Sequence, residues 1–70
     1  MLKLFTTPTC AYCVQVKKYL EAKSVPYTVQ EAEGQEYQEL ASKYGYTVPL
    51  VYNGKDGMVG FNIAKLNSLI

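Results

Sequence analysis

The chain has 70 residues with two cysteines, no histidine and no tryptophan, and its 7 basic and 6 acidic residues give a net charge of +1. A chain of this size buries only about 60% of its unfolded surface, which fits one small domain spanning residues 1–70. The 49% hydrophobic and 19% charged fractions argue against disorder. No apolar run approaches the roughly 20 residues of a membrane span, and Lys3 and Thr6 interrupt the apolar start that a signal peptide would need.

The first half of the chain alternates between strand and helix patterns. Residues 2–6 form a short run rich in strand formers. Apolar side chains then recur at helical spacing, at Cys13, Val16 and Leu20. Pro26 disfavours helical geometry in the residue before it, so this helix should end by residue 25. Residues 27–30 alternate polar and less polar side chains, which weakly indicates a second strand.

The second half contains the clearest amphipathic helix and a hairpin. The helix is marked by Tyr37, Leu40, Ala41 and Tyr44, and Gly45 is suited to end it. Residues 49–52 then resemble a strand, and the Asn-Gly and Asp-Gly pairs within 53–57 predict a turn back into a short strand at 58–59. A final helix is expected to bury Ile63, Leu66 and Ile70.

The predicted order is strand, helix, strand, helix, strand, strand, helix, or βαβαββα. Alternating units favour a parallel first half, and the hairpin closes the sheet. Three helices cannot share one face of four short strands. We therefore expect an α/β fold with a four-stranded mixed sheet and helices on both faces.

Charge is distributed unevenly along the sequence. Residues 1–30 carry a surplus of three positive charges, and residues 31–45 a surplus of three negative charges. Solvated faces of two helices explain this asymmetry better than an acidic partner does. Every basic residue is lysine, so no side chain can make the bidentate guanidinium contact to phosphate or guanine. Nucleic acid is therefore not an expected partner.

The two cysteines form a Cys-X-X-Cys motif at the junction between the first strand and the first helix. If Thr9 caps the helix, Cys10 lies in the first turn, where free N–H groups and the helix dipole stabilise a thiolate. Cys10 should then have a lowered pKa and act as the nucleophile, whereas Cys13, one turn deeper, resolves the mixed disulfide.

Two other interpretations of the cysteines carry less weight. A structural disulfide that closes a four-residue ring contributes only about 2 kcal/mol in the loop-entropy model. A structural zinc site needs four ligands, and the chain offers two thiolates and no imidazole, so no metal site is expected within one chain. A metal- or iron–sulfur-binding module formed by two chains stays open. A redox dithiol is the preferred interpretation.

Four short motifs resemble those of the glutaredoxins, in the same order and over nearly the whole chain. They are Phe-Thr-Thr-Pro-Thr-Cys10-Ala-Tyr-Cys13, Thr47-Val48-Pro49, Val-Tyr-Asn-Gly-Lys55 and Gly60. The Thr-X-Pro-X-Cys pattern and the Val-Gly60-Phe61 segment are also similar to the NrdH-type redoxins, relatives that take electrons from thioredoxin reductase.

The resemblance implies a thioredoxin-like fold, thiol–disulfide oxidoreductase activity and particular roles for residues. Cys10 would attack and Cys13 would resolve. Pro49 would be a cis-proline that faces the dithiol and leaves the Val48 backbone free to pair with substrate. The substrate-binding residues would be Thr9, Tyr12, Thr47, Val48, Pro49, Gly60 and Phe61.

The resemblance also implies partners. The expected substrate is a disulfide-containing protein such as ribonucleotide reductase. No cofactor is expected to be bound, and electrons would come from glutathione or from a flavoprotein, thioredoxin reductase. The chain lacks the lysine that many glutaredoxins carry shortly before the first cysteine to meet a glutathione carboxylate. We expect a cytoplasmic monomer.

Overall fold

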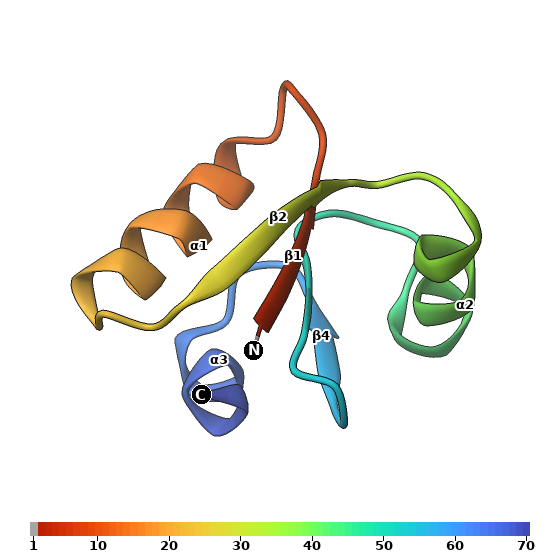
Figure 1. Ribbon diagram of the computed structural model, residues 1–70. Helices are drawn as coiled ribbons and strands as arrows, with labels where there is room; N and C mark the ends of the chain where they lie inside the picture. The colour runs from red at the N-terminus through yellow and green to blue at the C-terminus, as the bar shows by residue number, and fades with distance from the viewer. Residues whose placement is uncertain (1) are drawn as a thin grey trace.

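The computed structural model describes residues 2–70, and its helices and strands follow the predicted order (Figure 1). They are β1 (Leu2–Thr6), α1 (Ala11–Ala22), β2 (Tyr27–Glu31), α2 (Gln35–Tyr44), β3 (Leu50–Tyr52), β4 (Gly57–Val59) and α3 (Ile63–Leu69). None of the helices in this part of the chain is long and apolar enough to cross a membrane.

The four strands form one mixed sheet in the order β2-β1-β3-β4. β1 and β2 are parallel, from Leu2 opposite Tyr27 to Thr6 opposite Glu31. β3 runs antiparallel to both β1 and β4. Because β2 is parallel to β1, the chain must cross over between them, and α1 makes that connection. The predicted four-stranded mixed sheet of an α/β fold is confirmed.

Helices cover both faces of the sheet, as predicted. Leu4 and its sequence neighbour Phe5 are both fully buried, and they belong to different cores because successive strand residues point to opposite faces. The Leu4 core takes its helical residues from α1 and α3, and the Phe5 core takes them from α2. In Figure 1, α1 and α2 accordingly lie on opposite sides of the strands.

The buried face of α3 differs from the predicted one. Leu66 and Leu69 are buried, whereas Ile63 and Ile70 are about half exposed. The helix ends at Leu69, so Ile70 lies outside the helical repeat that the spacing predicted. Leu66 and Leu69 are three residues apart and therefore share a face of the helix. The prediction that Ile63, Leu66 and Ile70 form the buried face was wrong for the two isoleucines.

The β3–β4 turn is held by Asn53. Its side-chain oxygen accepts hydrogen bonds from the N–H groups of Lys55 (2.8 Å) and Asp56 (2.6 Å). Its side-chain nitrogen donates to the Leu69 carbonyl, 3.2 Å away at the end of α3. The predicted turn is confirmed, and one asparagine both shapes it and attaches the last helix to it.

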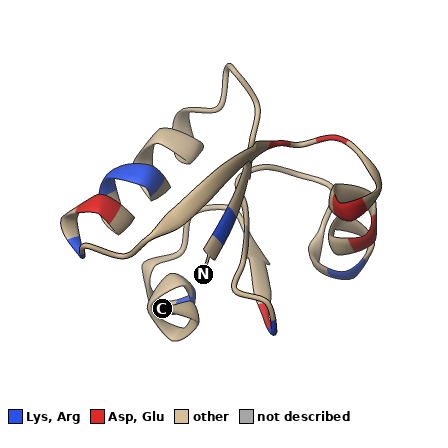
Figure 2. Ribbon diagram, in the orientation of Figure 1, with Lys and Arg blue, Asp and Glu red and all other residues tan. Residues whose placement is uncertain are grey.

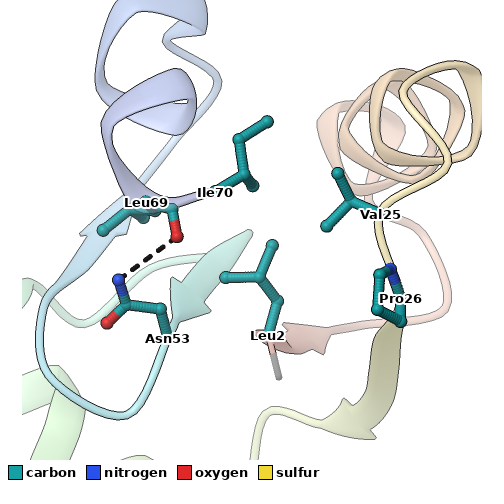
Figure 3. Close-up of a pocket in the computed structure, with 6 residues that line it drawn as sticks. All are labelled: Leu2, Val25, Pro26, Asn53, Leu69 and Ile70. Atoms are coloured by element: carbon teal, nitrogen blue, oxygen red, sulfur yellow. Dashed lines mark hydrogen bonds between the residues drawn. The ribbon is translucent and has the colours of Figure 1, made fainter.

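A cavity of about 240 Å³ lies at the start of β1 (Figure 3). It is lined by Leu2, Val25, Pro26, Asn53, Leu69 and Ile70. The two cysteines follow the other end of β1, so this cavity contains none of the predicted site residues.

The uneven charge of the sequence corresponds to a difference in charge between the helices on the two faces of the sheet. Figure 2 shows mainly basic positions on α1, with one acidic position, and mainly acidic positions on α2 and the segment before it, with one basic position, on opposite sides of the sheet. One ion pair joins Lys3 Nζ of β1 to Glu36 Oε2 of α2 at 2.6 Å. Both side chains are partly exposed, so the pair adds little to stability.

Candidate dithiol active site

Cys10 caps α1 with its own sulfur. The residue has extended backbone geometry (φ −86°, ψ 107°), and its Sγ accepts a hydrogen bond from the Cys13 N–H at 3.0 Å. The helix begins one residue later, at Ala11. The condition considered from the sequence, that Thr9 caps the helix and Cys10 lies in its first turn, does not hold, because Cys10 is itself the capping residue and its sulfur is the capping acceptor. Thr9 is instead an exposed residue of the loop after β1.

The two sulfurs differ in accessibility. Cys10 and Cys13 are joined by a disulfide, with their Cα atoms 5.2 Å apart. Cys13 is buried, with only 2% of its surface exposed, whereas Cys10 is partly exposed at the start of the helix. A disulfide of a large substrate can therefore approach Cys10 and cannot approach Cys13 directly.

A second loop, residues 47–49, precedes β3. The Val48–Pro49 peptide bond is cis, as the resemblance implied, and Pro49 is buried. The Pro49 carbonyl accepts a hydrogen bond from the Gly60 N–H at 2.8 Å, which extends the β3–β4 pairing by one residue. Within residues 2–70, no hydrogen bond from the Val48 N–H to another backbone group is found.

Two aromatic rings bring a third segment to the start of α1. The rings of Tyr12 and Phe61 are stacked, with centroids 6.5 Å apart and planes 15° apart. Tyr12 is 62% exposed, and Phe61 is partly buried against the core beneath α1 and α3. The stack joins two of the predicted substrate-binding residues beside the cysteine motif.

The segments that carry the predicted site residues contain no lysine, arginine, aspartate or glutamate. These segments are residues 4–16, 46–54 and 57–64. Figure 2 shows the start of α1 and the loop before it free of charged positions. Within these segments, the groups that can contact a ligand are backbone groups, hydroxyls, side-chain amides, sulfur atoms and apolar or aromatic side chains. Within the described residues, no group of three potential metal-ligating side chains is found.

The structure thus pairs Cys10 with Cys13, Tyr12 with Phe61, and Pro49 with Gly60. Thr9 and Thr47 are both exposed. The sequence reasoning missed Tyr37, whose hydroxyl donates to the Thr47 carbonyl at 3.3 Å. Its helical spacing predicted only a core position, and nothing in the sequence marked its hydroxyl.

A mixed four-stranded sheet with helices on both faces and a Cys-X-X-Cys motif at the start of α1 define a thioredoxin-fold dithiol protein. The family model for glutaredoxin matches residues 2–57. The chain belongs to the glutaredoxin family. Membership together with the Cys10–Cys13 pair supports a thiol oxidoreductase.

One relative and two solved structures are similar to this chain. Over 75 aligned residues the chain is 35% identical to an uncharacterised glutaredoxin-like 8.6 kDa protein in the rubredoxin operon of Clostridium pasteurianum, covering 100% of this chain and 97% of that one. The glutaredoxin of Archaeoglobus fulgidus is similar in structure, with a TM-score of 0.75, 26% identity and coverage of 97% and 83%. The thioredoxin-like protein BC3987 has a TM-score of 0.79, 27% identity and full coverage of both chains.

Proposed function

We propose that this protein reduces disulfides of other proteins through its dithiol and acts as a monomer. The observation that carries the proposal is the arrangement of the two cysteines: Cys10 is partly exposed at the helix start and Cys13 is buried behind it. An exposed nucleophile and a protected resolving thiol are what two-step thiol–disulfide exchange requires.

The exchange proceeds in two balanced steps. The Cys10 thiolate attacks one sulfur of the substrate disulfide, that bond breaks, and the substrate leaves one thiolate while its other sulfur is bonded to Cys10. Cys13 then loses its proton and attacks Cys10 Sγ, which releases the second substrate thiolate. The substrate gains two electrons and two protons, and the protein is left with the Cys10–Cys13 disulfide.

Substrate would be held by the uncharged surface around the dithiol. An extended substrate segment pairs antiparallel with the Val48 backbone, whose N–H makes no other backbone hydrogen bond among the described residues. The Tyr12–Phe61 stack contacts apolar parts of the same segment. Thr9 and Thr47 offer exposed hydroxyls beside it. A disulfide-containing protein such as ribonucleotide reductase is the proposed client, by resemblance to the NrdH-type redoxins.

The electron source is either glutathione or the flavoprotein thioredoxin reductase. Glutathione carries two carboxylates, and the three segments that carry the site residues offer no cationic side chain to them. This absence favours the flavoprotein. The two sources are compared directly by following NADPH oxidation during turnover of one protein disulfide, with thioredoxin reductase in one arm and glutathione plus glutathione reductase in the other.

The cysteine roles are tested with Cys10→Ser and Cys13→Ser. We expect Cys10→Ser to abolish reduction of a protein disulfide such as that of insulin. Cys13→Ser should carry out only the first step and accumulate a mixed disulfide, visible by mass spectrometry as the added mass of the substrate. Retained turnover in Cys10→Ser, or a mixed disulfide on Cys13 of the wild type, would contradict the proposal.

A further inference from the structure

Tyr37 of α2 directs its hydroxyl at the substrate-binding loop while its ring is fixed in the core. The side chain is 8% exposed, and its ring packs against that of Phe5 with centroids 5.7 Å apart. Its hydroxyl donates a hydrogen bond to the Thr47 carbonyl at 3.3 Å. A ring held by core packing has little conformational freedom. Its hydroxyl therefore has a nearly fixed position, and the hydrogen bond to Thr47 restrains the loop relative to the core.

The loop is anchored on both sides of one residue. Tyr37 binds the carbonyl of Thr47, and the Gly60 N–H binds the carbonyl of Pro49. Val48 lies between these anchors, and its side chain packs against the Phe5 core. The Val48 N–H has no backbone partner within residues 2–70. Val48, the residue proposed to pair with substrate, thus lies between two anchored neighbours and has a packed side chain, and its N–H stays available. Its carbonyl accepts a hydrogen bond of 3.5 Å from the Thr47 hydroxyl.

We propose that Tyr37 is a positioning residue for substrate binding, acting through Thr47 on the Val48 backbone. The inference rests on the proposed function, because it assumes that substrate pairs with Val48. A backbone strand binds a peptide more tightly when it is already ordered, since less conformational freedom is lost on binding. The hydrogen bond from Tyr37 would keep the Val48 backbone ordered before substrate binds. Tyr37 lies on α2, which contains none of the predicted site residues.

The test removes the hydroxyl and keeps the ring, in Tyr37→Phe. The matched control is Tyr44→Phe on the same helix. The Tyr44 ring packs beside Tyr52 with centroids 6.4 Å apart. Within the described residues, the tyrosine hydroxyls that donate hydrogen bonds are those of Tyr19, Tyr27 and Tyr37 and not that of Tyr44. Pre-reduced wild type and both variants react with increasing concentrations of a fluorogenic peptide disulfide in a stopped-flow instrument. A small aromatic disulfide, which has no peptide backbone to pair with Val48, serves as the second substrate.

We expect Tyr37→Phe to raise the half-saturating concentration of the peptide about threefold to tenfold, the range that the loss of one hydrogen bond implies. The limiting rate and the rate with the small disulfide should not change, and Tyr44→Phe should match the wild type throughout. Melting curves by circular dichroism establish that each variant is folded. Equal half-saturation in Tyr37→Phe and wild type overturns the positioning role. An equal loss with both disulfides also overturns it, because the defect would then lie in the dithiol.

An inactive dithiol and an incorrect role for Tyr37 give different results in these measurements. If the proposed function is wrong, the wild type itself shows no Cys10-dependent reduction of the peptide disulfide. If only the role of Tyr37 is wrong, the wild type is active and Tyr37→Phe is equally active at every peptide concentration.

Discussion

The backbone N–H of Cys13 donates a hydrogen bond to Cys10 Sγ at 3.0 Å. The residue that carries the buried thiol therefore also holds the exposed sulfur, independently of its own side chain. A sulfur that accepts an N–H bond at a helix start is placed where negative charge is favoured. Both effects persist when the side chain of Cys13 is replaced.

The Cys10 thiol should have a pKa below that of a free cysteine once the disulfide is reduced. The variant Cys13→Ser isolates this thiol and keeps the residue-13 N–H. We expect the rate of alkylation by iodoacetamide to rise with pH at a lower inflection in the folded variant than in the same variant unfolded in urea. An inflection at the same pH in both states would show that the helix start does not stabilise the thiolate.

Gly60 should affect substrate reduction as well as stability. Its φ of +82° is in the region that favours glycine, and an added Cβ would meet nothing within 4 Å, so Gly60→Ala adds backbone strain without a clash. The expected cost is about 1–2 kcal/mol in the free energy of unfolding. Because Gly60 also anchors Pro49, reduction of a peptide disulfide should slow more than the loss of folded protein explains.

Gly34 supplies the matched control for that experiment. It has a φ of +92°, and an added Cβ would again meet nothing within 4 Å, but it lies before α2 and in none of the three segments that carry the predicted site residues. Urea unfolding should show a loss of stability for both Gly34→Ala and Gly60→Ala, because both positions have a positive φ. Stopped-flow reduction should show a defect in Gly60→Ala alone, and equal kinetics in the two variants would argue against the anchoring role.

The order of elements could be predicted because each is encoded locally. The helical spacing that includes Val16 and Leu20 and the turn chemistry at Asn53 both act within a few residues. What the sequence could not supply were relationships that form only on folding. Whether Thr9 or Cys10 caps α1 depends on where the sulfur lies, and the bond from Tyr37 to Thr47 joins elements whose separation the sequence does not encode.

The two apolar residues at positions 63 and 66 should differ in their effect on stability. Leu66 of α3 is fully buried, whereas Ile63 of the same helix is 48% exposed. Leu66→Ala should lower the free energy of unfolding by about 2–5 kcal/mol, the usual cost of a core cavity. Ile63→Ala should change it by no more than about 0.5 kcal/mol. Urea denaturation of both variants measures the difference. Comparable losses in the free energy of unfolding would mean that Ile63 belongs to the buried face of the helix, as the spacing predicted.

Alkaline pH should weaken the contact between Tyr27 and Glu21. The Tyr27 hydroxyl donates to Glu21 Oε2 at 2.6 Å, and this hydrogen bond, with burial and the carboxylate charge, raises the pKa of Tyr27 above its ordinary value of 10.0. The folded protein therefore holds this proton more tightly than the unfolded chain does. The contribution of this hydrogen bond to the free energy of unfolding is therefore fully present below pH 10.0. It is lost as the pH rises through the pKa of Tyr27 in the folded state.

Tyr27→Phe reports that loss, because it removes the hydroxyl and leaves the other tyrosines to titrate equally in both proteins. The oxidised protein is used, since its cysteines do not titrate. Urea unfolding at a series of pH values should show the wild type more stable than Tyr27→Phe at neutral pH. This advantage should shrink above pH 10.0. In Glu21→Gln, the pKa of Tyr27 should fall toward its ordinary value, as measured by tyrosinate absorbance. A difference between wild type and Tyr27→Phe that stays constant across the alkaline range would mean that the hydrogen bond with Glu21 does not couple to folding.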